Sequence, residues 1–283
     1  MSPATALPPH PPAHLRYHRR LRTTDVVQEL WTARELIRTL VERELRARYK
    51  QMMLGAAWTI IPPLTLMLVF TLFLHRGGRI DTQGIPYPLF AYLGLLPWTF
   101  FSSSVSRGGT SLLQNAALLN KVYCPREVYP MASMVVAGMD TLVALPILAV
   151  LFAVFRTLPQ PTAILALPLV VVQVIFTLGV TLFVSAVSIY LRDLRLALPI
   201  LLQLGLFATP VAYGSEVVPP RLALAYAALN PLAPVIDGYR RVVLLGQPPA
   251  GEALLVGALS SLVVLALGYV VFKRLETGFA DVA

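Results

Sequence analysis

The residues of this chain that could do chemistry are few, and their spacing matches no catalytic site. There is no G-x-x-x-x-G-K-[ST] phosphate-binding loop and no H-E-x-x-H metal motif, and Cys124 is the only cysteine. A transferase acting on lipid-linked sugars would need a catalytic base and usually a pair of metal-binding carboxylates, whereas Asp140, Asp193 and Asp237 are isolated along the chain. We therefore expect no enzyme and no metal, cofactor or ATP bound by this chain. A membrane-embedded glycan transferase stays only as an alternative.

Asp140 is the one ionisable residue well inside an apolar segment of membrane-spanning length. Such residues often line a pathway or relay protons. Asp140 could equally be a buried carboxylate bonded to a neighbour such as Thr141 or Gln173, and the residues leave both interpretations open. A single carboxylate, without detectable internal repeats, is little support for an ion-coupled carrier.

The composition indicates that much of the surface faces lipid. Of the 283 residues, 57% are hydrophobic and only 13% charged, and the mean hydropathy is +0.70. A soluble domain carries about 25% charged residues, and a helix needs about 20 apolar residues to cross a bilayer. Six segments meet or approach that length, which predicts an all-α integral membrane protein with six transmembrane helices. These segments are residues 57–74, 88–105, 131–155, 164–191, 196–213 and 253–272.

The distribution of lysine and arginine predicts that both termini lie in the cytoplasm. With the N-terminus inside, most of the 23 basic residues fall in segments on the inner side. The net charge of +9 then reflects contact with anionic lipid headgroups, so we expect membrane lipids and no nucleic acid as partners. Residues 1–24 contain no apolar signal region, and the first span is expected to direct insertion.

The regions outside the six segments have different characters. Residues 1–24, rich in proline and histidine, predict a disordered tail rather than a metal site. Residues 25–50 predict an amphipathic helix whose apolar face lies on the membrane surface, and residues 51–283 form the six-helix domain. Between the last two spans, residues 214–251 predict short re-entrant or interfacial helices. The fifth span ends at Pro210, which indicates a broken helix.

Two charged loops are predicted on the inner side. In the first, Pro125 could begin a short helix, and Glu127 would suit the positive end of its dipole. Such a helix would be a handle for a partner protein, although both loops could simply be basic inner loops. The candidate contact residues are Lys121, Tyr123, Pro125, Arg126 and Glu127 in the first loop and Arg192, Asp193 and Arg195 in the second.

Several motifs resemble those of permease subunits in ABC-2 type polysaccharide exporters, the Wzm- and TagG-like family. They occur in the order of that family, and the resemblance covers roughly residues 25–283. The motifs are RYKQMMLGAAW at 48–58 with Pro62, KVYCPRE at 121–127, the Tyr-x-Arg-Asp turn at 190–193, LNPL at 229–232 and the tail GFADV at 278–282.

The resemblance implies a division of labour between this chain and a partner. Two permease copies would form a channel, and two copies of a separate cytoplasmic subunit would bind ATP and Mg. The loop at residues 118–129 would be the main coupling helix, and residues 192–195 a second contact. The cargo would be a lipid-linked glycan resembling O-antigen, teichoic acid or capsule, exported across the bacterial inner membrane. A permease for a drug or small lipid is the alternative within the same superfamily.

A glycan path needs aromatic platforms and uncharged hydrogen-bonding groups, because sugar rings have weakly apolar faces and polar hydroxyls. Aromatic residues also mark bilayer interfaces, so any one of them could have that simpler role. The candidate channel-lining residues are Tyr92, Trp98, Phe101, Asp140, Gln203 and Tyr213.

Overall fold

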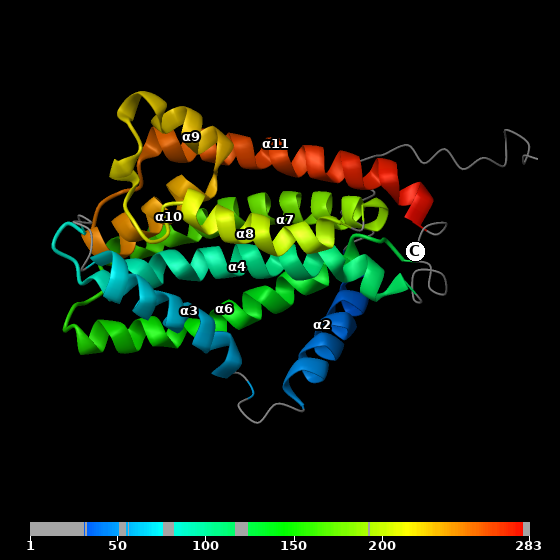
Figure 1. The fold of residues 1–283 in the computed structure, drawn as a ribbon, viewed down its shortest axis with the longest axis horizontal. Helices are drawn as coiled ribbons and strands as arrows, with labels where there is room; N and C mark the ends of the chain where they lie inside the picture. Colours follow the sequence, from blue (N-terminus) through cyan, green and yellow to red (C-terminus); the bar gives the residue numbers. More distant parts are fainter. Residues whose placement is uncertain are drawn as a thin grey trace, which may run out of the picture.

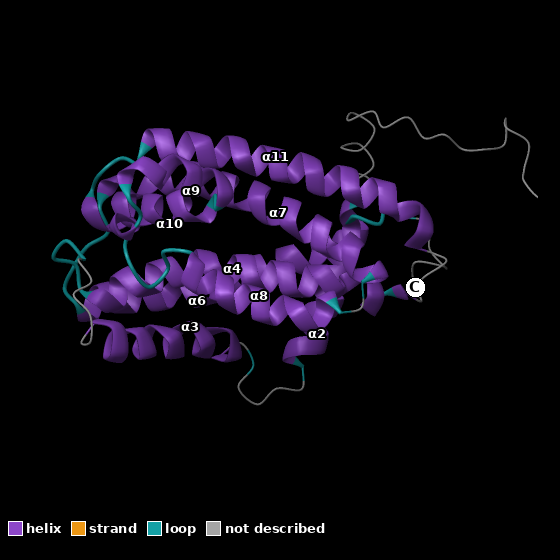
Figure 2. Ribbon diagram, turned by 45° about the horizontal axis from the view of Figure 1, so that its top comes forward, coloured by secondary structure: helices purple, strands orange, loops and turns teal. Residues whose placement is uncertain are grey.

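The computed structural model describes residues 31, 33–50, 55, 57–75, 82–116, 124–191 and 193–279. Throughout those ranges the regular elements are all helices, with no strand (Figures 1 and 2). The predicted all-α class is therefore confirmed for the part of the chain that is described. The predicted tail at 1–24, the first residues of the amphipathic helix, and Lys121, Tyr123 and Arg192 lie outside the described residues.

Six helical segments run along the long axis of the molecule, and successive ones run in opposite directions (Figure 1). Each overlaps one of the six predicted apolar segments, although the second helix extends to Gln114 and the fifth ends at Ala208. The first is α3 followed by a π-helical turn, and the fourth begins with a 3-10 turn. Their bounds are α3 Ala57–Val69 with η2 Phe70–His75, α4 Tyr87–Gln114, α6 Val128–Val154, η3 Pro161–Leu165 with α7 Ala166–Tyr190, α8 Leu194–Ala208 and α11 Gly251–Leu275.

Three helical stretches are long and apolar enough to cross a membrane, namely Val128–Val154, Pro161–Tyr190 and Gly251–Gly278. The stretches Ala57–Phe73 and Leu194–Ala208 are apolar but shorter. The chain therefore has the helices of a membrane protein, while the count of six spans stays a prediction.

Helix α4 is the centre of the bundle. It contacts α3, α6, α7, α8 and α10, and most of its side chains from Tyr87 to Leu112 are buried. Its second half carries serines, two glycines and Arg107. Ser104, Ser111 and the two glycines are buried by the surrounding helices, while Arg107 is partly buried, so α4 can be less apolar than its neighbours.

The C-terminal end of α8 is broken near a proline, as predicted. Helix α8 ends at Ala208, and Pro210, which has no N–H to continue the helix, lies in the turn that follows. Short elements then fold together at one end of the molecule, on the left in Figure 1. They are η4 Ser215–Val217, η5 Pro220–Leu222, α9 Ala223–Leu229, α10 Leu232–Arg240 and the π-helical η6 Arg241–Leu245.

Helix α2 (Arg34–Tyr49) lies at the opposite end of the bundle, against the start of α6 (Figure 1). Leu40 and Val41 of its apolar face are buried in contact with the bundle, and Leu36 and Ile37 are partly buried there. Part of the face predicted to lie on lipid is thus covered by protein. The position of α2 on the membrane surface stays a prediction.

Helices α7 and α11 approach each other closely through two glycines. A Cβ on Gly179 would lie 2.7 Å from the Cα of Leu265, and a Cβ on Gly268 would overlap the carbonyl oxygen of Gly179. Small residues at such crossings let two membrane helices pack backbone against backbone. The α7–α11 pair therefore behaves as one packed unit.

We expect Gly268→Ala to destabilise this unit, because the new methyl group meets backbone that cannot rotate away. Overpacking of this kind costs roughly 1–3 kcal/mol of the free energy of unfolding. Thermal unfolding in detergent, followed by circular dichroism, measures the change. The matched control is Gly138→Ala in α6, where a Cβ would meet only the Phe100 ring at 3.6 Å. Equal unfolding temperatures for both variants would contradict the close α7–α11 crossing.

Candidate functional site

The candidate site is the end of the bundle where α2, the start of α6 and the last turns of α7 and α11 meet, on the right in Figure 1. A single group of buried apolar side chains joins these elements, and we call it the end cluster. It consists of Leu40, Val41, Leu112, Val128, Tyr129, Ala132, Val136, Leu182, Ala186, Ile189, Phe272 and Phe279. Phe279, from the tail motif, is fully buried and meets Phe272 edge to face with ring centroids 5.5 Å apart.

The first predicted contact loop leads directly into α6. The Val128 N–H donates to the carbonyl of Pro125 at 3.2 Å, and Glu127 is the N-cap residue of α6. Pro125 and Glu127 thus stand at the start of a helix, as their residue types suggest, but that helix is α6 itself. Cys124 lies beside them with its Sγ 3.6 Å from the hydroxyl of Tyr129.

Arg126 and Glu127 point toward the C-terminal end of the described chain. The Glu127 carboxylate forms an ion pair with Lys273 of α11, and the two side chains are only 3% and 8% exposed. The Arg126 guanidinium donates to the carbonyl of Glu276 at 2.6 Å. The charge of Glu127 is therefore paired inside this chain, and only Arg126 of the two keeps a partly open side chain.

The second predicted contact, the turn between α7 and α8, is open. Asp193 and Arg195 are both exposed, and among the described residues neither forms an ion pair. The Asp193 carbonyl accepts from the N–H groups of Leu196 and Ala197 at 3.0 Å, which fixes the backbone of the turn. These two side chains are available to a partner.

Asp140 is held by residues from two other helices. Arg107 of α4 donates to it at 2.8 Å, Arg48 of α2 forms a second ion pair, and the Tyr49 hydroxyl donates at 2.5 Å. The partners are thus neither Thr141, whose hydroxyl donates to the Ala137 carbonyl, nor Gln173. Asp140 is only 7% exposed, so it joins α2, α4 and α6 by charge.

Burial also shifts the titration of two α2 side chains beside Asp140. Burial and the hydrogen bond to Asp140 raise the pKa of Tyr49 to about 12, because both favour the protonated hydroxyl. Burial raises the pKa of the Glu44 carboxyl above its ordinary value, although a hydrogen bond from Ser133 opposes the shift. The cluster therefore favours a protonated Tyr49 and disfavours a second full negative charge at Glu44.

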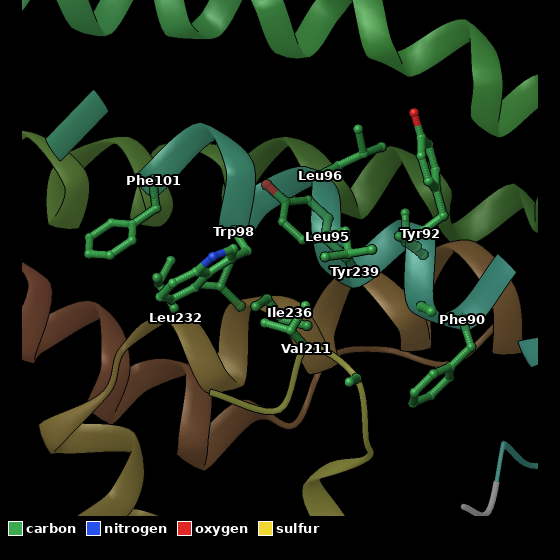
Figure 3. Close-up of a cluster of buried hydrophobic side chains, with 14 of the residues drawn as sticks. Phe90, Tyr92, Leu95, Leu96, Trp98, Phe101, Val211, Leu232, Ile236 and Tyr239 are labelled. Atoms are coloured by element: carbon green, nitrogen blue, oxygen red, sulfur yellow. The ribbon is translucent and has the colours of Figure 1, made fainter. Parts of the chain in front are cut away.

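Three predicted channel residues lie inside the bundle core. Tyr92, Trp98 and Phe101 are 0%, 6% and 8% exposed, and Figure 3 shows them among the buried side chains of α4 and α10. The Tyr92 hydroxyl donates to the Ala144 carbonyl at 2.8 Å, and the Phe101 ring stacks on Phe176 at 5.5 Å. In the single chain these three residues pack helices together and face no open surface.

Besides Asp140, two predicted channel residues remain, and both are accessible. Gln203 is exposed on α8, on the same face as Ile200, Leu204 and Phe207. Tyr213 is half-buried just beyond α8, and its hydroxyl donates to the Phe207 carbonyl at 2.8 Å. Gln203 and Tyr213 thus remain candidates for lining a path beside α8.

A buried arginine organises the opposite end of the bundle. Arg240 of α10 is 3% exposed, and its guanidinium lies 3.6 Å above the ring centre of Phe90. It donates to the carbonyls of Pro210 at 2.7 Å and Tyr213 at 3.0 Å, and to those of Phe90 and Val211. Gly94 makes room for it, because a Cβ there would lie 2.5 Å from the guanidinium. Arg240 therefore holds the irregular segment that follows α8.

The roles of Arg48, Arg107, Arg240 and Lys273 could not be predicted from the sequence patterns. Backbone carbonyls have no side-chain signature, so no spacing points to the contacts of Arg240. For the other three, the one available signal was the need of Asp140 and Glu127 for a buried counter-charge. In the described ranges, no three His, Cys, Asp or Glu side chains gather as metal ligands would.

Comparison with known proteins identifies relatives over almost the whole chain. Residues 35–244 match the family model described as ABC-2 type transporter. The O-antigen export system permease protein RfbA of Myxococcus xanthus is 34% identical over 258 residues, covering 90% of this chain and 98% of that protein. A protein of the same name from Klebsiella pneumoniae is 27% identical over 88% of this chain and 95% of its own length. The polysialic acid transport protein KpsM of Escherichia coli is 26% identical, over 85% and 93%.

We expect Asp140→Asn to loosen α2 from the bundle, because two arginines lose the carboxylate between them. Each arginine is about a quarter exposed, so the loss in free energy of unfolding should be roughly 1–3 kcal/mol, below that for a fully buried pair. Thermal unfolding in detergent measures it.

The matched control for this prediction is Glu42→Gln. Glu42 also lies between two arginines, Arg38 and Arg46, but those are 81% and 78% exposed. Its removal should cost less than about 0.5 kcal/mol. Similar losses for both variants would show that Asp140 contributes no more than a surface ion pair.

Proposed function

Because the chain belongs to the ABC-2 type transporter family, we propose that it is the permease subunit of an ATP-driven exporter of a lipid-linked polysaccharide. The observation that carries the proposal is the 34% identity to an O-antigen export permease over 98% of that protein's length. The K. pneumoniae and E. coli relatives, whose names also specify polysaccharide export or transport, support the same cargo class. O-antigen-like or capsule-like glycans fit these relatives, and a teichoic-acid-like glycan is a further candidate.

The energy for export would come from a separate ATPase subunit that binds ATP and Mg. The chain contains no phosphate-binding loop, whereas two charged turns lie at one end of the bundle. Asp193 and Arg195 are exposed there, and Arg126 is partly open. We propose that this end faces the cytoplasm of a bacterium and meets the ATPase, with both termini on the same side of the inner membrane.

A second copy of the chain would complete the path. The six helical segments are proposed as six spans, and α8 exposes an apolar face with Leu196, Ile200, Leu204 and Phe207 between 57% and 78% accessible. The polar Gln203 interrupts that face, and Tyr213 stands at its end. Such a face is suited to a path between two permeases, in which a glycan chain meets aromatic rings and an amide. If the two permeases are related by a two-fold axis, each presents the same contact to an ATPase subunit, and the assembly has two copies of each protein.

The proposal is tested by co-expressing the permease with candidate ATP-binding subunits from the same organism. We expect the two to purify together and the ATPase to hydrolyse ATP faster in the complex. In cells, deleting the permease should remove the lipid-linked glycan from the surface and leave it inside. A pair that never associates rejects the ATPase partner, and normal surface glycan after deletion points to a drug or small-lipid exporter instead.

We expect Arg195→Glu to weaken association with the ATPase by roughly tenfold, because it reverses an exposed charge in the proposed contact. Binding of the purified subunits at two salt concentrations measures the effect, which should shrink as salt rises. The matched control is Arg221→Glu, since Arg221 is also exposed but belongs to η5 at the opposite end. Equal binding of both variants would exclude the α7–α8 turn from the interface.

A further inference from the structure

The loop before α6 is attached to the end of α11 by a buried ion pair. Glu127 and Lys273 are separated by most of the helical domain in sequence, yet their side chains pair at 3% and 8% exposure. Lys273 also bonds Glu276 at 2.8 Å, in the turn that follows α11. One ammonium group thus holds two carboxylates, one from each element.

Arg126 makes a second attachment to the same turn. Its guanidinium donates to the Glu276 carbonyl at 2.6 Å and lies 5.6 Å from the ring centre of Phe279. Two consecutive loop residues therefore hold the turn at residues 276–279 from one side. This leaves the loop little freedom to move without α11.

The end of α7 is attached to that turn as well. The Tyr190 hydroxyl donates to the Leu275 carbonyl at 2.8 Å, and its ring lies 6.3 Å from that of Phe279. Gly278 is needed for this approach, since a Cβ there would overlap the Tyr190 hydroxyl. Tyr190 lies just before the exposed Asp193–Arg195 turn. Both charged turns are thus connected through the last turn of the described chain.

The Glu127–Lys273 pair contributes more to position than to stability. Among the described residues, the second carboxylate oxygen of Glu127 is buried without a hydrogen-bond partner. A buried ion pair with such an incomplete set of bonds recovers little more than its own desolvation cost, but each charge strictly requires the other. The pair therefore specifies one placement of the loop relative to α11.

Helix α11 can carry a displacement into the bundle. It packs along α7 through the Gly179 and Gly268 crossing, where the two backbones touch. A push on the loop would move the end of α11, and the backbone contact would pass the movement to α7. Packed helices transmit such shifts because they are not continuously deformable.

We propose that Lys273 is a positioning residue for energy coupling, which ties the loop at 124–127 to α11 so that the two move together. This rests on the proposed function, in which an ATPase subunit acts on that loop. Lys273 contacts neither ATP nor glycan and acts only through Glu127 and Glu276.

The test compares Lys273→Gln with the wild-type permease, each in complex with its ATPase subunit. We expect the variant complex to assemble and to hydrolyse ATP at about the wild-type rate, while surface glycan per complex falls about fivefold. The conservative variant Lys273→Arg, which keeps a cation between Glu127 and Glu276, should retain most of the export. The control is Arg274→Ala, an exposed neighbouring cation whose removal should change neither quantity.

Cys124, the only thiol of the chain, gives a readout that is independent of transport. It is partly buried beside Tyr129, so a looser loop should react faster with a maleimide. We expect labelling of the full complex to be about threefold faster in Lys273→Gln and normal in Lys273→Arg. A merely stabilising pair would lower the amount of complex but leave export per ATP and the labelling rate unchanged, which would overturn the inference.

A milder variant tests the positioning role of Lys273 if the Lys273→Gln permease does not form a complex with the ATPase subunit. Glu276→Gln keeps Glu127 paired and removes only the more exposed carboxylate, which is 20% accessible. It should lower export about twofold and speed labelling of Cys124, and wild-type values for both would reject the proposal. Failure of the wild-type permease to bind the ATPase would instead reject the proposed function, before any variant is compared.

Discussion

A charge inside an apolar helical bundle is stable only beside an opposite charge or a full set of hydrogen-bonding groups. Among the described residues, Asp140, Glu127 and Arg240 are buried, and each of them helps to decide how several elements meet. Asp140 joins α2, α4 and α6, and Glu127 joins α6 to α11. Arg240 joins α10 to α4 and to the irregular segment after α8. Apolar contacts alone could be made in many registers, whereas these polar contacts allow one.

The two ends of the bundle use this constraint differently. At the end with α9 and α10, the hydrogen bonds that Arg240 makes to described residues go to backbone carbonyls, so it fixes the course of the chain there. At the other end the charges come in pairs from different helices, and the pairs lie next to exposed charged turns. The first arrangement suits a fixed structure, and the second suits elements that must move together.

A permease that is powered by a separate ATPase, as proposed, must receive work through contacts with that protein. In the proposed assembly, force enters at charged turns and has to reach helices that pass through the membrane. The connections of Arg126, Glu127 and Tyr190 to the end of α11 provide a continuous physical route, because each is a direct bond between elements. The close glycine crossing of α7 and α11 extends that route along the length of the bundle.

The sequence by itself determined the helical class, the approximate places of the long helices and the family. These properties are local, since the length of an apolar run, a proline that ends a helix, or a short motif can be read without knowing what lies opposite. Thus the break before Pro210 and the charged turn at 193–195 could be predicted. The family's match over residues 35–244 agrees with motifs that the sequence displays directly.

Only the tertiary structure decided the partners of the buried charges and which aromatic residues are core. Arg48 and Asp140 are 92 residues apart, and Arg126 and Glu276 are 150 apart. Tyr92, Trp98 and Phe101 have the chemistry of a glycan path, but α4 is enclosed by other helices and buries them. Which face of a helix is covered depends on the packing of all its neighbours, and an apolar residue can look the same whether it meets lipid, cargo or protein.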